Sequence, residues 1–117
     1  MKYIIVVVFG CVLFAGVIAG CSGGAKVNKE PTTSAIRAAE EVGASGVPGA
    51  SLYLQLAKEE LVQAKVLAAN GEKEQAESML ERAEADAELA VALSHSDADK
   101  KEAADAIERV RLLRQGN

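Results

Sequence analysis

The sequence of 117 residues has no tryptophan, one histidine, two cysteines and two prolines, and aromatic residues make up only 3% of it. A catalytic or metal-binding His95 would need companion groups around it, and the sequence supplies no second histidine. We therefore expect His95 to be a surface residue. We also expect no catalytic residue, no metal site and no cofactor.

Three of the four aromatic residues and Cys11 lie within the first 20 residues. The rest of the chain keeps only Tyr53, expected to be a packing residue, and Cys21, so neither a disulfide nor a thiolate metal site is expected there. Alanine supplies much of the apolar content, and it favours helix while burying little area. This composition predicts elongated helix pairs and not a large globular core.

The first 20 residues resemble a secretory signal. Lys2 precedes an apolar run from Tyr3 to Ile18, and small residues crowd the end of that run. With Ala19 and Gly20 included the stretch is 18 residues, at the lower limit for a membrane span, and no cluster of Lys or Arg follows it to stop transfer. Val17-Ile18-Ala19-Gly20-Cys21 then resembles the bacterial lipobox, in which an aliphatic residue and two small residues precede an obligatory cysteine.

The lipobox resemblance implies cleavage between Gly20 and Cys21 and acylation of Cys21 by a diacylglyceryl group and an N-acyl chain such as palmitate. Such an anchor is expected to hold the chain on a membrane, because each buried methylene contributes about 0.8 kcal/mol. Ser22 replaces the Asp that tends to retain Gram-negative lipoproteins at the inner membrane, so the resemblance implies the periplasmic face of the outer membrane in such a source. The alternative is an uncleaved N-terminal helix with a free Cys21, and Cys11 is interpreted as an apolar filler.

Removal of residues 1–20 leaves 97 residues that carry 12 Lys and Arg against 17 Asp and Glu. That length fits one small domain. The acidic balance argues against nucleic acid as a partner, because a phosphate backbone attracts basic surfaces.

The remaining chain divides into a flexible tether over residues 21–31 and a helical domain over residues 32–117. Three helices are predicted, at about 34–42, 51–69 and 73–113. A proline and hydroxyl residues mark the first start, and three glycines and a proline over residues 43–49 break the chain. Asn70-Gly71 predicts a tight turn between the second and third helices.

The two longer segments each carry an apolar seam at steps of three and four residues. The seams are Ala50, Leu54, Ala57, Leu61, Ala64 and Ala68, and then Ala76, Leu80, Ala83, Ala87 and Ala90. We therefore predict an all-α fold, a short helix followed by an antiparallel helical hairpin whose last helix is long and coiled-coil-like. The apolar phase slips at residues 94–99, so the last segment is either one helix of about 60 Å with a stutter, which we favour, or two helices.

Residues 67–76 resemble the inner turn of a tetratricopeptide unit, but the chain has no second copy of that repeat. A closer resemblance, over residues 31–93, is to bacterial lipoproteins of domain-of-unknown-function family 4398. The matching residues are Pro31 with Ala35–Glu41, Leu56-Ala57 with Leu61 and Ala64, Gly71 with Ala76, and Ala83–Ala90. The resemblance implies an envelope lipoprotein with a helical domain, and it supplies no catalytic residue.

Two sets of side chains are candidates for contact with a protein partner. Glu77, Glu81, Glu84 and Glu88 share one helix face, which is either a docking face for a basic partner or a solvated surface. Ile107, Val110 and Leu113 form a stripe beyond the reach of the shorter second helix. That stripe fits a protein partner, or a second copy in a coiled coil like the murein lipoprotein, whose terminal lysine has no counterpart in Arg114–Asn117.

Asp97, Asp99, Asp105 and Glu108 are spaced like calcium-loop ligands, but Glu102 stands where the sharp turn needs glycine. We therefore expect a charged helical surface there. Taken together, the sequence predicts a lipid-anchored envelope protein with a structural or adaptor role and no enzymatic activity. A small-ligand carrier would need an enclosed cavity between the helices.

Overall fold

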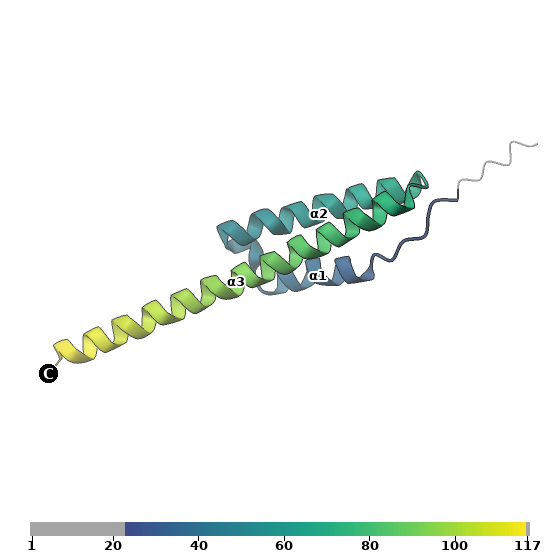
Figure 1. Ribbon diagram of the computed structural model, residues 1–117. Helices are drawn as coiled ribbons and strands as arrows, with labels where there is room; N and C mark the ends of the chain where they lie inside the picture. The colour runs from purple at the N-terminus through teal and green to yellow at the C-terminus, as the bar shows by residue number, and fades with distance from the viewer. Residues whose placement is uncertain (1–22, 117) are drawn as a thin grey trace, which may run out of the picture.

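The computed structural model describes residues 23–116, so the predicted leader and the Gly20-Cys21 cleavage site lie outside the described residues. Three α-helices follow an irregular N-terminal segment (Figure 1). They are α1 (Glu30–Glu41), α2 (Pro48–Ala69) and α3 (Lys73–Gln115), and a single 3-10 turn, η1 (Ala44–Gly46), joins the first two. The predicted all-α fold with a helical hairpin and a long last helix is confirmed.

α1 begins four residues before its predicted start at residue 34, and α2 begins three before residue 51. The reason is that Pro31 and Pro48 lie in first turns, where a backbone N–H has no partner within the helix and proline removes nothing. Glu30 and Pro31, which the sequence assigned to the tether, are therefore helical. At the other ends, α1 stops at Glu41 and α3 continues to Gln115, two residues beyond its predicted end.

Both predicted breaks contain a glycine in the left-handed backbone region. Gly43 ends α1 with a φ of 76°, and Gly71 forms the α2–α3 turn with a φ of 83°. A side chain at either position would clash with the following carbonyl, so glycine is favoured there. The N–H of Glu72 donates to Leu67 O (2.9 Å), which closes the end of α2.

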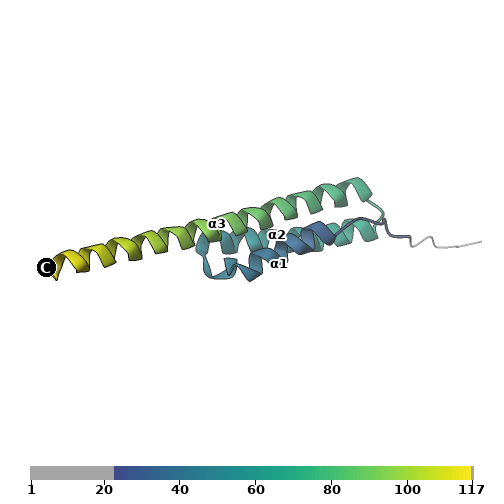
Figure 2. The same ribbon diagram turned by 90° about the horizontal axis from the view of Figure 1, so that it is seen from below.

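α1 and α2 both pack on the first half of α3, α1 running parallel to it and α2 antiparallel (Figures 1 and 2). The core between them is made mainly of alanine, with Ile36, Leu54 and Leu80 as its larger members. The fully buried alanines include Ala57, Ala83, Ala87 and Ala90. Because these side chains are small, the helix axes can approach closely and the domain stays thin.

Thr32 ties α1 to α3, although the sequence suggested a capping role for the hydroxyl residues around it. Thr32 is 1% exposed, and its Oγ1 donates a hydrogen bond to the backbone carbonyl of Leu80 (3.1 Å). The bond joins residues 48 positions apart in the chain. This bond fixes the position of α1 along the axis of α3.

α3 is one continuous helix of 43 residues, about 65 Å long. Its buried seam runs from Ala76 to Ser94, whose Oγ donates to Ala90 O (2.8 Å). The buried seam therefore ends where the sequence placed the start of the phase slip, at residue 94. Every residue from 98 to 115 is exposed, and we call this segment the arm.

Candidate contact surfaces

The two ends of the described chain lie at opposite ends of the molecule (Figures 1 and 2). The irregular segment at residues 23–29 returns to the α2–α3 turn, where the N–H of Ala25 donates to Ala68 O (2.7 Å). A Cβ on Gly24 would lie 3.2 Å from the same carbonyl oxygen, so the chain passes close to α2 here. The arm projects from the other end of the hairpin, with no helix beside it.

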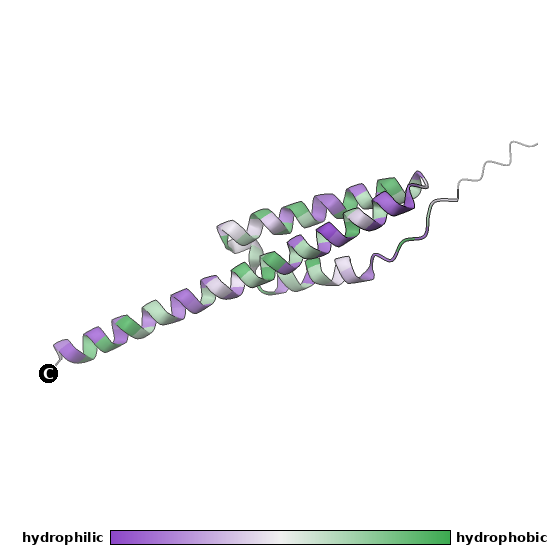
Figure 3. Ribbon diagram, viewed as in Figure 1, coloured by the Kyte–Doolittle hydropathy of each residue, from purple (hydrophilic) through white to green (hydrophobic). Residues whose placement is uncertain are grey.

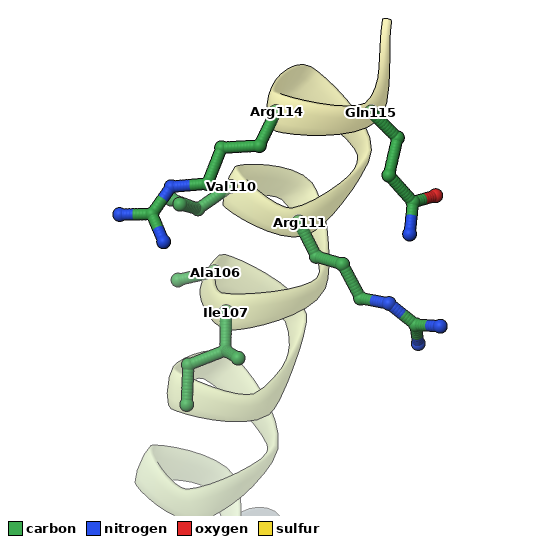
Figure 4. A pocket seen from close by; sticks show the side chains of 6 residues that line it. All are labelled: Ala106, Ile107, Val110, Arg111, Arg114 and Gln115. Atoms are coloured by element: carbon green, nitrogen blue, oxygen red, sulfur yellow. The ribbon is translucent and has the colours of Figure 1, made fainter.

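The predicted apolar stripe is carried by the arm and is open to solvent. Ile107 is 70% exposed, Val110 48% and Leu113 73%. Figure 4 shows Ala106, Ile107 and Val110 projecting from one side of the helix, with Arg114 on that side and Arg111 leaving on the other. Ile107 and Val110 line a shallow, open depression along this helix, together with the other residues that Figure 4 labels.

The arm stripe faces away from α1 and α2. At about 100° per residue, the stripe that includes Val110 points to roughly the opposite side of α3 from the seam that ends at Ala90 and Ser94. A longer α2 would therefore not cover it. Along the arm polar and apolar residues alternate, so the stripe is not part of a continuous apolar block (Figure 3).

The calcium-like spacing lies entirely within helix α3, so its carboxylates are spread along a rod. Asp97 pairs with Lys101 (2.7 Å), and Glu108 pairs with Arg111 (3.4 Å). Over residues 23–116 no group of three or more His, Cys, Asp or Glu side chains is placed to hold a metal ion.

The predicted acidic face is divided by its neighbours. Glu77, Glu81 and Glu88 are exposed and Glu84 is half-buried, while Lys73 pairs with Glu77 (3.6 Å). Glu84 and Glu88 line one side of a shallow groove between α1 and α3, whose other lining residues are Pro31, Ser34, Ala35, Ala38 and Val91. The four carboxylates therefore do not form one surface: Glu84 and Glu88 lie beside α1, and Glu77 and Glu81 lie in solvent.

The sequence interpretation missed a buried carboxylate in the hairpin. Glu60, placed off the seam, is 7% exposed and takes the seam position expected for Leu61, which is half-buried. Its Oε1 pairs with Arg82 Nη2 across the α2–α3 interface (2.9 Å), and its buried Oε2 has no hydrogen-bond partner among the described residues. Burial, and then the nearby carboxylate of Asp86, raise the pKa of Glu60, and Arg82 opposes this shift.

A further exposed apolar set lies on the outer face of α2, and the sequence interpretation did not single it out. Leu52 is 56% exposed, Val62 59% and Val66 56%. Glu59 and Gln63 lie among them, so the set is broken by polar groups. The sequence pattern that could have indicated this set is the spacing of four residues within the pairs Leu52-Leu56 and Val62-Val66.

The remaining candidate residues are placed as surface or packing groups. His95 is exposed, and Tyr53 is half-buried against the core between α1, α2 and α3. No helix formed by residues 23–116 has the length and apolar character needed to cross a bilayer. The depressions along the described helices are shallow and open.

Comparison with known families identifies the domain. The model of the family Domain of unknown function (DUF4398) matches residues 30–106, which begin at the start of α1 and end within the arm. No curated protein and no solved structure matches the chain. Because the match covers well over half of the 117 residues, this chain belongs to the DUF4398 family.

Proposed function

We propose that this chain is a lipid-anchored cell-envelope protein that acts structurally, as an adaptor or spacer, through helix–helix contacts. The observation that carries the proposal is that the N-terminal segment and the exposed arm stripe lie far apart along the molecule. The described N-terminal segment lies at the α2–α3 turn, and the exposed arm stripe lies about 50 Å or more away along α3. A rod attached at the first end holds the stripe away from the surface to which it is attached.

The attachment would be made by acyl chains on Cys21 after removal of residues 1–20. Residues 22–29 then link the anchor to α1, and eight residues of extended chain span about 3 nm at most. In a Gram-negative source we propose the periplasmic face of the outer membrane. The lipobox resemblance of Val17–Cys21 supports this placement.

The contact role rests on the exposed arm stripe, with the acidic face of α3 as a second surface. Apolar side chains held in solvent along a helix are stabilised when a partner covers them. We propose a protein partner and no enzymatic activity, cofactor or nucleic acid.

Mass analysis of the chain purified from a bacterial envelope tests the anchor. We expect the mature chain to begin at Cys21 and to carry the mass of a diacylglyceryl group and an N-acyl chain. Cys21→Ser should abolish both cleavage and acylation, whereas Cys11→Ser should leave the mature mass unchanged. Recovery of the full leader with a free thiol at Cys21 would refute the placement.

Site-specific photo-crosslinking in intact envelopes tests the contact surface. A photoreactive residue at Val110 should give discrete crosslinked species. The same residue at Lys101, which is exposed and lies about 180° around the helix from Val110, is the control and should give fewer. Equal crosslinking at both positions would contradict the proposed role of the stripe.

A further inference from the structure

Acidic and basic side chains are separated along the arm. From Ala98 to Glu108 there are four acidic and two basic residues, and from Arg109 to Gln115 there are three arginines and no acid. The arm therefore has an acidic half and a basic end. Two such helices attract each other when they run in opposite directions and repel at both ends when they run in the same direction.

Two single residues beside the stripe, one acidic and one basic, also favour antiparallel packing. With Ala103, Ala106, Val110 and Leu113 as the contact seam, Glu102 and Arg109 lie on the same flank of it, two turns apart. Neither takes part in an ion pair within residues 23–116, whereas Lys101 and Arg111 are paired along their own helix. Both flanking charges are exposed, so an incoming helix can reach them.

We propose that the arm stripe is a homodimer interface, in which the arms of two copies pack antiparallel and Ala103, Ala106, Ile107, Val110 and Leu113 of each copy lie against residues 98–108 of the other. With the two-fold axis close to Asp105 and Ala106, Glu102 of each copy faces Arg109 of the other, and the ion pair forms twice. Parallel packing in register would instead bring Arg109 of one copy to Arg114 of the other, because flanking residues five positions apart then meet.

The stripe direction permits this arrangement. Since it points to roughly the opposite side of α3 from α1 and α2, a second arm can lie along it without displacing either helix. The starts of the two α3 helices would then be about 100 Å apart, at opposite ends of the assembly. This inference deepens the proposed contact role, for which it names the partner as a second copy and its orientation.

Single cysteines in the full chain in detergent micelles report the orientation. Ala106→Cys lies near the axis, so it should form disulfide-linked dimers under mild oxidation. Leu113→Cys should not, because two copies of this residue would be about 22 Å apart in the antiparallel dimer and a disulfide needs Cα atoms within about 7 Å. The parent chain, which carries Cys11 and Cys21, sets the background.

Charge variants followed by analytical ultracentrifugation report the sign of the pairing. Arg109→Glu should lower the dimer fraction several-fold, and Glu102→Arg combined with Arg109→Glu should restore it. Arg37→Glu, at an exposed cation on α1, is the matched control and should leave the fraction unchanged. Parallel packing predicts the opposite, since Arg109→Glu would then relieve repulsion from Arg114.

The proposal is overturned if Leu113→Cys crosslinks as well as Ala106→Cys, or if Arg109→Glu increases dimerisation. It is also overturned if the parent chain stays monomeric at every concentration and Ala106→Cys gives no more dimer than the background. Dimerisation through the arm is measured whether or not Cys21 is acylated, so this proposal and the lipid anchor can fail separately.

Discussion

Removing Arg82 should destabilise the hairpin at neutral pH much more than in acid. Within residues 23–116 the Glu60 carboxylate pairs with Arg82, and the side chain of Glu60 is 9% exposed whereas that of Arg82 is 67% exposed. Loss of one partner from a fully buried ion pair costs about 3–5 kcal/mol, and loss of an exposed pair costs about 0.2–1 kcal/mol. This pair is buried on one side only, so we expect Arg82→Ala to lower the free energy of unfolding by about 1–3 kcal/mol at pH 7.

The pH dependence follows from the direction of the pKa shift of Glu60. Burial and Asp86 already raise this pKa, and Arg82→Ala removes the interaction that lowers it. As pH rises above the ordinary range of a glutamate, the unfolded chain loses this proton more readily than the folded chain, so stability falls with pH. Below that range Glu60 is protonated in both states, and the loss caused by Arg82→Ala should shrink by half or more.

Urea unfolding of the full chain in mild detergent, followed by circular dichroism at 222 nm at pH 4 and pH 7, measures this effect. Glu60→Leu should be neutral or stabilising at pH 7, because a carboxylate in an apolar seam is replaced by an apolar group. In that background Arg82→Ala should cost less than about 0.5 kcal/mol, as for a surface substitution. Lys58→Ala, which breaks the half-exposed pair with Glu40, is the control and should cost less than about 1 kcal/mol at either pH.

An equal loss of unfolding free energy on Arg82→Ala at pH 4 and pH 7 would refute the proposed role of the Glu60 charge. An unchanged cost of Arg82→Ala when Glu60 is leucine would refute it as well, because Arg82 would then stabilise the fold through packing and not through the buried carboxylate.

Three further variants test other parts of the packing. Thr32→Val should lower stability by about 0.5–1.5 kcal/mol, measured by urea unfolding, because Leu80 O loses its extra donor; no change would mean that the bond contributes nothing. Ala87→Leu, at a fully buried position, should cost about 1–3 kcal/mol through overpacking and broaden the thermal transition; an unchanged melting temperature would show that the helices can move apart. Gly71→Ala should cost about 1–2 kcal/mol because of its positive φ, whereas Gly23→Ala should be neutral, and equal effects would contradict the strained turn.

Much of the hairpin was predictable, because helix period and turn chemistry are local properties. The spacing of alanine and leucine by three and four residues placed Ala57, Ala83 and Ala87 in the interface. Gly71 occurs where a left-handed residue is required, so the turn followed from one residue type. The comparison of helix lengths also predicted that α3 would extend beyond α2, and α3 has 43 residues against 22 in α2.

Tertiary packing decided which residues are buried where the spacing of three and four residues allowed more than one choice. From Ala57 the next seam residue is reached by a step of three, to Glu60, or of four, to Leu61. Leu61 packs against the core and is half-buried, but Glu60, which the pattern left out, is the more deeply buried of the two and pairs with Arg82. The height and direction of α1 on α3 were set by contacts such as Thr32 with Leu80, 48 residues apart, which no local pattern encodes. Sequence by itself thus determined which segments are helices and which faces are apolar, because those depend on neighbours within one turn. Only the packed structure decided which polar side chain is buried and which apolar stripe stays uncovered, since both depend on where another helix lies.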